Sequence, residues 1–362
     1  AVLVSQYWGR GDTENINPCI GVALYAVTGF STVLALITFF FPAQVLGLIT
    51  PNQALIDLAT SYIQIVGFSY IFNGISSIYA GVQRSTEYPA FGMFLFGISM
   101  CVNTFLNYVL IFGKFGAPAL GVTGAAIATF TSRVVEFLVA LGFALCNRRL
   151  PLRPRYIFHP GSFIFRSFVK YSTPVVANEA MWSLGTSMLT VIMGHMENSQ
   201  DMLAAYALIG NIDKLSTVVC FGIAASAAVI VGKEIGAGTD HKKVYEISWT
   251  LLLVSLMLGA GVVLLLLGLL PIFFQPVLFP LFKLSSGATL AATSMAIVSA
   301  VFMPMRAFDI TNITGVLRAG GDARIASVID ITPLWLVAIP LMAVSALVLN
   351  APAPLVCSAM QA

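Results

Sequence analysis

Two acidic side chains within long apolar stretches are the clearest candidates for chemistry in this sequence. Glu179 has no basic neighbour on its predicted helix, and Glu179 and Asp309 each follow a proline by five residues, Pro174 and Pro304. A proline within a membrane helix frees a backbone carbonyl and permits bending. Carboxylates are costly in hydrocarbon unless they face a cavity or a partner. We therefore predict that this pair binds a cation or a proton.

The same two carboxylates are predicted to lie at one depth. Glu179 comes nine residues after Lys170, and Asp309 comes nine residues before Arg318. Nine residues span about 13 Å along a helix axis. The alternative for each is a structural hydrogen bond, and for Asp309 an ion pair with Arg306 three residues earlier.

Polar and aromatic side chains near these acids could line a cavity. Trp182 is three residues after Glu179 and shares its helix face, where it could offer a cation–π surface or simply pack. Three further cavity candidates are Asn178, Arg306 and Asn73.

The first half of the chain offers an uncharged candidate site. Asn103 and Asn107 lie one turn apart on a predicted helix, so both amides face one way. Gln64 and Asn73 lie on the preceding helix. The alternative is that these amides join helices by hydrogen bonds without binding a ligand.

The remaining charges within apolar stretches have simpler interpretations. Arg133 and Glu136 are three residues apart and are expected to neutralise each other. Asp213 and Lys214 are adjacent and do not face each other, so the sequence assigns them no partners. Asp330 is predicted to lie near the membrane interface, shortly after Arg324.

Composition determines the class of protein that carries these residues. The chain is 58% hydrophobic and only 9% charged, with a mean hydropathy of +0.92 and a net charge of +3. Such a chain has too little polar surface for a water-soluble domain, which excludes a cytosolic enzyme and a nucleic-acid binder. There is no Cys-x-x-Cys and no His-Glu-x-x-His motif, and no histidine is predicted within a span, so an intramembrane enzyme is disfavoured.

Continuous apolar runs predict an all-α polytopic membrane protein, because helices of about 20 apolar residues cross a bilayer. The stretches 1–8 and 351–362 are interpreted as parts of two further helices. Complete spans are predicted near 18–48, 54–80, 90–113, 120–145, 168–194, 202–231, 247–275, 288–316 and 325–349.

Basic residues give the predicted membrane orientation and domain boundaries. Most lysines and arginines fall on alternate connections, which the positive-inside rule makes cytoplasmic. The basic stretch 146–167 is predicted to be a cytoplasmic linker between two transmembrane bundles, 1–145 and 168–362.

Two pairs of short segments indicate an internal repeat. VSQYWGRGD (4–12) parallels VGKEIGAGT (231–239), and GVQRS (81–85) parallels GVLRA (315–319), at offsets of 227 and 234 residues. All four lie at predicted cytoplasmic helix ends, so the repeat preserves orientation. Parallel repeats of this kind are found in transporters, where a two-fold axis runs along the membrane normal.

The run CVNTFLNYVLIFGKFGAPALGVTGAAIATFTSR (101–133) resembles the hallmark segment of the multidrug and toxic compound extrusion (MATE) family. SQYWGRGD near the start and GVLRAGGDAR (315–324) are similar to two further motifs of that family. The resemblance covers essentially the whole chain. It implies a MATE-like fold of two six-helix bundles related by pseudo-two-fold symmetry, with the first helix, most of the second and most of the twelfth outside this sequence.

The resemblance also implies a function. Family members export cationic or amphipathic compounds in antiport with Na+ or H+, by alternating access and without other cofactors. Glu179 and Asp309 match the family's acids on the seventh and tenth helices, and would hold Na+ if the protein is sodium-coupled. Asn103, Asn107 and Thr129 match the cation site of the first bundle.

The implied protein is not an enzyme. It would be a monomeric, multi-pass protein of the cell inner (plasma) membrane, whose partners are drug molecules and the lipid bilayer rather than nucleic acid. The alternative is a flippase for lipid-linked oligosaccharides or lipids in the same superfamily. Such a flippase needs a cationic cavity for diphosphate, and few basic residues lie within the predicted spans.

Overall fold

The described part of the chain is helical throughout, apart from turns and connecting segments. The computed structural model describes residues 2–47, 53–147, 149–153, 155, 157, 162–196, 199–282, 284–349 and 355–356. Within these ranges eight helices are long and apolar enough to cross a membrane. The prediction of an all-α membrane protein is therefore confirmed. Most of 351–362, predicted to be part of a further helix, lies outside the described residues.

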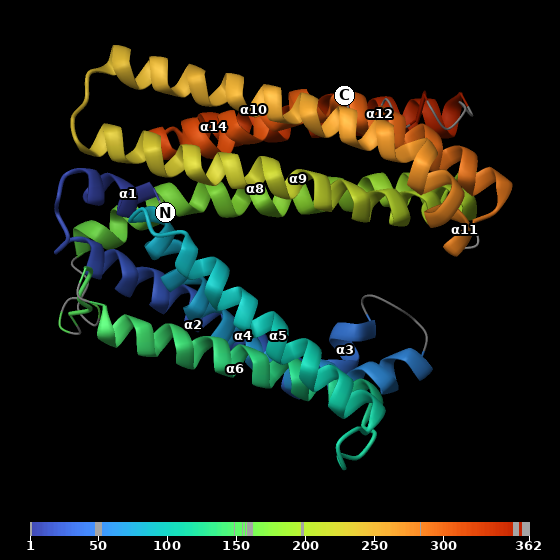
Figure 1. The fold of residues 1–362 in the computed structure, drawn as a ribbon, viewed down its shortest axis with the longest axis horizontal. Helices are drawn as coiled ribbons and strands as arrows, with labels where there is room; N and C mark the ends of the chain where they lie inside the picture. The colour runs from blue at the N-terminus through green and yellow to red at the C-terminus, as the bar shows by residue number, and fades with distance from the viewer. Residues whose placement is uncertain are drawn as a thin grey trace. The chain divides into compact units, whose positions relative to one another are not determined.

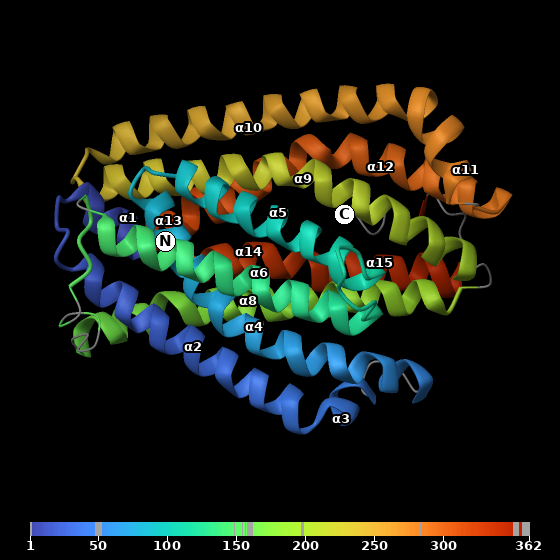
Figure 2. The same cartoon turned by 60° about the horizontal axis from the view of Figure 1, so that its bottom comes forward.

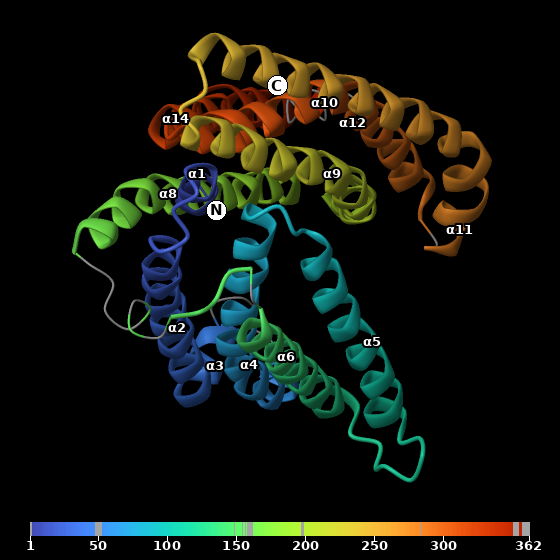
Figure 3. The ribbon, with the colours of Figure 1, turned by 60° about the vertical axis from the view of Figure 1, so that its left-hand side comes forward.

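The chain divides into two compact units, one covering residues 3–168 and the other 169–362. In the first unit, α4 packs along both α2 and α6, and α5 packs against α6 (Figures 1 and 3). Its elements are α1 (Val2–Gly9), α2 (Ile16–Phe40), α3 (Pro42–Gly47), α4 (Gln53–Ser85), α5 (Ala90–Phe112) and α6 (Gly121–Cys146).

One predicted span of this unit is wrong in detail. The apolar run 18–48 predicts a single helix, but α2 ends at Phe40 and the short α3 begins at Pro42. A residue that precedes proline is pushed away from helical geometry, and Phe41 has left it with φ −127° and ψ 44°. The apolar composition continues through the break, so it does not reveal it.

The second unit is built on α9, α10 and α12, which run alongside one another (Figure 2). Its helices are interrupted by four π-helical segments, η1 to η4. The elements are α8 (Ser162–Gly194), α9 (Ser199–Gly236), α10 (His241–Leu269), η1 (Leu270–Leu278), α11 (Phe279–Leu281), α12 (Ser286–Ile310), η2 (Thr311–Leu317), α13 (Arg318–Gly320), α14 (Ala323–Pro333), η3 (Leu334–Ala338), α15 (Ile339–Ala343) and η4 (Val344–Val348).

Helix α8 differs from the other long helices in its polarity. It is 33 residues long and covers the predicted span 168–194, yet it is not among the eight helices that are apolar enough to cross a membrane. Asn178 and Glu179 lie in its middle, within a stretch rich in serine and threonine. This is the helix expected to carry polar chemistry, because polar groups within the membrane face a cavity or a protein partner.

The internal repeat is visible as repeated turn geometry. After α1, the Gly11 amide donates to the Trp8 carbonyl at 3.0 Å, and after α9 the Gly238 amide donates to the Ile235 carbonyl at 3.1 Å. The two glycines have φ of +74° and +76°. In both turns the amide of the residue after the glycine also donates to the carbonyl of the residue five positions before it. Helix ends that close with a residue in the left-handed conformation have this hydrogen bond.

The second pair of segments repeats in the same way. The Glu87 amide donates to the Arg84 carbonyl and the Gly321 amide donates to the Arg318 carbonyl, both at 3.2 Å. Glu87 and Gly321 both have positive φ, at 64° and 100°. Arg84 is therefore the counterpart of Arg318 in the repeat.

Substitution of Gly238 by alanine is expected to lower the free energy of unfolding by about 1 kcal/mol, because a Cβ strains left-handed backbone. No atom lies within 4 Å of the position that a Cβ would take, so the effect isolates the backbone strain. The control is Gly222→Ala within the preceding helix α9, where space is also open and alanine is the better helix former. Unfolding in detergent checks both variants, and equal stabilities of the two would contradict the assigned turn.

Candidate functional site

Glu179 faces an arginine rather than the predicted second acid. Its Oε1 lies 3.0 Å from Nη1 of Arg318, and the Glu179 side chain is 61% exposed. Nη2 of Arg318 lies 3.6 Å from Oδ2 of Asp330 on α14. The guanidinium thus sits between carboxylates of two helices.

Three polar contacts join α8 to α14, which carries Asp330, and to the π-helical segment η3 that continues it. The Ser327 hydroxyl donates to the Pro174 carbonyl at 3.1 Å, and the Trp335 indole donates to the Met181 carbonyl at 3.2 Å. Between them, Nδ2 of buried Asn178 donates to Oδ2 of Asp330 at 2.6 Å. These contacts are three to five residues apart on both helices, so the two run parallel and keep the same faces in contact.

Asp309 lies on α12 with an exposed side chain. It forms no hydrogen bond or ion pair with a described residue, and the expected alternative partner, Arg306, is bound elsewhere. The structure does not bring Asp309 and Glu179 into contact. A π-helical segment, η2, lies between Asp309 and Arg318, so their nine-residue spacing is not that of a regular α-helix.

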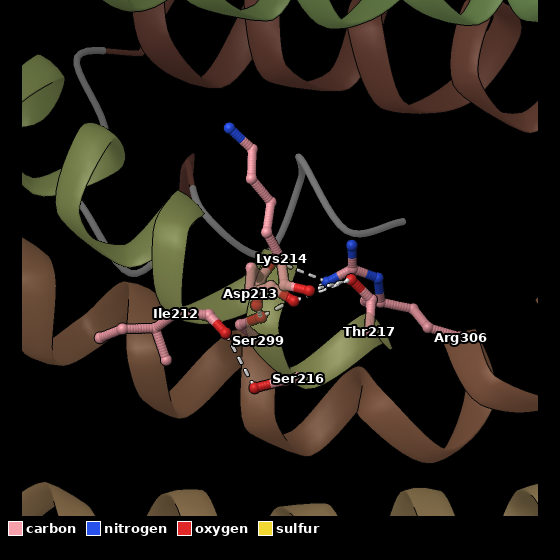
Figure 4. Close-up of polar contacts among 7 residues, drawn as sticks. All are labelled: Ile212, Asp213, Lys214, Ser216, Thr217, Ser299 and Arg306. Carbon is pink, nitrogen blue, oxygen red and sulfur yellow. Dashed lines mark hydrogen bonds and ion pairs between the residues drawn. The ribbon is translucent and has the colours of Figure 1, made fainter. Parts of the chain in front are cut away.

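Arg306 pairs with Asp213, an acid for which the sequence suggests no partner. Nη1 of Arg306 lies 2.8 Å from Oδ2 of Asp213, and the Ser299 hydroxyl donates to the other oxygen of Asp213. Figure 4 shows these three side chains meeting, whereas the Lys214 side chain extends away from them. The pair neutralises two charges between α9 and α12, so Arg306 has a structural partner within the membrane helices.

The predicted uncharged site of the first unit forms a connected cluster. Nδ2 of Asn107 donates to Oδ1 of Asn103 at 2.9 Å, and Nδ2 of Asn103 reaches the hydroxyls of Thr129 and Ser132 at 3.4 and 3.5 Å. Oδ1 of Asn107 is buried and has no hydrogen-bond partner. The cluster thus holds one unused acceptor. Asn73 is not part of it.

The remaining predictions concern individual side chains. Arg133 and Glu136 form the expected ion pair at 2.6 Å, with Glu136 fully buried. Trp182 is half exposed. The cation–π contacts found in the described residues involve other rings, those of Trp8 and Tyr171.

An aromatic pocket of about 500 Å³ lies in the first unit. Phe72 contacts Phe130 edge-on, with ring centroids 5.8 Å apart, and Gln64 supplies an amide whose nitrogen donates to the Phe39 carbonyl. The pocket could accept an apolar, aromatic molecule. Its lining residues are Phe39, Gln64, Ile65, Phe68, Phe72 and Phe130.

Sequence reasoning missed two members of the charged cluster. From the sequence, Arg318 only marks a cytoplasmic helix end, and Asp330 is expected near the interface. The motif GVLRAGGDAR contains the arginine, but only the packing of α8 against α14 shows what it contacts. Over the described residues, no group of three or more His, Cys, Asp or Glu side chains could hold a metal ion.

Ion pairs and polar clusters between the spans of a multi-pass helical protein are a common feature of membrane transporters. A sequence model of the MatE family matches residues 1–109 and 174–344. The chain belongs to this family, that of the MATE transporters, and is a multi-pass protein of the plasma membrane.

Curated relatives and solved structures agree with this family. The chain is 24% identical to the Bacillus subtilis (strain 168) transporter YisQ over 342 residues, covering 94% of this chain and 73% of the relative. It is also 24% identical to a probable multidrug resistance protein NorM of Bacillus cereus (strain ATCC 14579) over 348 residues, covering 94% and 74%.

Two solved structures show the same fold. One is an outward-facing multidrug resistance MATE family transporter, with a TM-score of 0.86, 16% identity, and coverage of 99% of this chain and 77% of that one. The other is a transporter of the MOP superfamily from Pyrococcus furiosus, with a TM-score of 0.86, 17% identity and the same coverage. That second transporter is described as having a binding pocket of reverse polarity, which suggests a different function for it.

Proposed function

We propose that this protein exports cationic or amphipathic organic compounds in antiport with Na+ or H+, by alternating access. The observation that carries the proposal is the exposed Glu179 carboxylate on α8, for which Arg318 is the one partner among the described residues. A carboxylate with one contact can exchange that partner for a coupling cation or a cationic substrate. The relatives named as probable multidrug resistance proteins support the substrate class.

The two candidate regions, one in each unit, suit ligands of different chemistry. The Glu179 region carries negative charge and would receive a cation. The aromatic pocket of the first unit would accept an apolar, aromatic molecule, because rings pack well against phenylalanine faces. Coupling follows if cation and drug favour different conformations of the carrier, since each ligand shifts the equilibrium by its differential affinity.

Transport by reconstituted protein tests the proposal. Proteoliposomes are loaded with a fluorescent organic cation, and a Na+ gradient and a pH gradient are imposed separately. Movement of the cation under one gradient establishes antiport and identifies the coupling ion. No movement under either gradient, with protein shown to be folded, would overturn the proposal and favour the flippase alternative, which a lipid-transfer assay then tests.

A further inference from the structure

Arg318 presents its positive charge to two acids from two other helices. Its side chain is only 12% exposed, and its two terminal nitrogens point at Glu179 and Asp330, at 3.0 and 3.6 Å. We propose that Arg318 is a built-in competitor for the cation site, and that the coupling cation displaces it from Glu179 onto Asp330. The inference rests on the proposed function, because it assigns the regulation of that same site.

The two ends of this contact differ in strength. Asp330 is fixed by Asn178, whose buried amide donates to it at 2.6 Å. Glu179 is exposed, and Arg318 is the partner that the described residues give its carboxylate. The contact with Glu179 is the shorter of the two, but the Asp330 side chain is 28% exposed against 61% for Glu179, and ion pairs weaken with exposure to solvent. The guanidinium therefore leaves Glu179 more easily than it leaves Asp330.

Buried polar atoms without a hydrogen-bond partner indicate how the Arg318 side chain could change its contacts. Nε of Arg318 and Oδ1 of Asn178 are both buried and have no partner. If the guanidinium turned toward Asp330, Nε and Nη2 could form two parallel bonds to one carboxylate, which is the preferred arginine geometry. The carboxylate of Glu179 would then be free of the arginine. Carboxylate oxygens are suitable ligands for a hard cation.

The backbone that carries Arg318 is held in place, so the change would occur in the side chain. Arg318 directly follows the π-helical segment η2, which packs on α9. A Cβ on Gly315 in this segment would lie 2.9 Å from both the Ala224 carbonyl oxygen and the Ala227 side chain. The backbone of η2 therefore lies so close to α9 that the segment has little room to shift. The long arginine side chain is the part that can exchange partners.

The internal repeat supplies a matched control. Arg84 occupies the position equivalent to Arg318, at the start of the same turn geometry. Its side chain is exposed and forms no ion pair within the described part of the chain. Neutralising Arg84 thus removes the same charge from an equivalent helix end without touching the acidic cluster.

Cation binding to the purified protein tests the proposal. Na+ is titrated at fixed pH, and protons are titrated without Na+, while a bound fluorescent organic cation is displaced. Arg318→Gln is expected to lower the cation concentration at half displacement roughly tenfold, because the competing charge is gone. Arg84→Gln is expected to leave it unchanged. Adding Glu179→Gln to Arg318→Gln is expected to abolish the gain.

The outcomes separate this inference from the proposed function. If the wild-type protein binds neither cation in competition with the drug, the proposed function fails and the inference with it. If the wild type shows competition and folded Arg318→Gln shows an unchanged or higher midpoint, the inference alone is overturned. If Arg318→Gln does not fold, Arg318→Lys decides. A lysine cannot hold both acids in a planar fork, so a severalfold lower midpoint supports the inference and an unchanged one overturns it.

Discussion

Glu179→Gln is expected to reduce cation-driven drug export roughly a hundredfold or more, because glutamine keeps the side-chain shape but removes the charge that binds the cation. The variant should fold, since the ion pair with Arg318 is largely exposed on the glutamate side and such pairs contribute at most about 1 kcal/mol. Gradient-driven uptake in proteoliposomes measures the loss.

The matched control for this prediction is Glu246→Gln on α10. Glu246 is exposed near the start of that helix, and its side chain has no partner within the described ranges. Its neutralisation is expected to leave export unchanged. Coupled export retained by Glu179→Gln at the wild-type rate would remove Glu179 from the mechanism.

Asp213→Asn is expected to lower the free energy of unfolding by about 2 kcal/mol, because it leaves the Arg306 charge between α9 and α12 without its carboxylate. The full cost of an unpaired buried charge is larger, but both side chains are partly exposed. Thermal or denaturant unfolding in detergent measures the change.

A double-mutant cycle shows whether this loss belongs to the pair. Arg306→Met in the Asp213→Asn background should recover part of the stability, since no unpaired charge remains. Lys214→Met is the control, because Figure 4 shows its side chain directed away from the cluster, and we expect a change within about 0.5 kcal/mol. Additive effects of Asp213→Asn and Arg306→Met would show that the pair does not stabilise the fold.

Much of the fold could be predicted from the sequence because a lipid bilayer restricts which backbone structures can cross it. A helix satisfies its backbone groups internally, as the membrane requires, so apolar length locates most of the spans. Local geometry was also predictable. The three-residue spacing of Arg133 and Glu136 predicts their ion pair, and the repeated glycines mark turns with nearly the same φ at Gly11 and Gly238.

The charged contacts between helices could not be predicted in this way. They depend on how each helix is rotated about its axis, and a helix that is apolar on all sides does not specify its rotation. Asp213 and Arg306 are 93 residues apart, and Glu179 and Arg318 are 139 apart. The π-helical segment before Arg318 adds to the difficulty, because it changes the angular spacing on which helical-face arguments depend.

Reciprocal binding tests the central claim most directly, namely that a cation and a drug compete through Glu179. The affinity of the purified protein for a fluorescent organic cation is measured at increasing Na+ or proton concentration, and its affinity for Na+ or protons at increasing drug. Thermodynamic linkage requires that each ligand weaken the other by the same factor. We expect one shared factor in the wild type and none in Glu179→Gln. Drug binding that no cation affects in the wild type, or an unchanged factor in Glu179→Gln, would contradict the account.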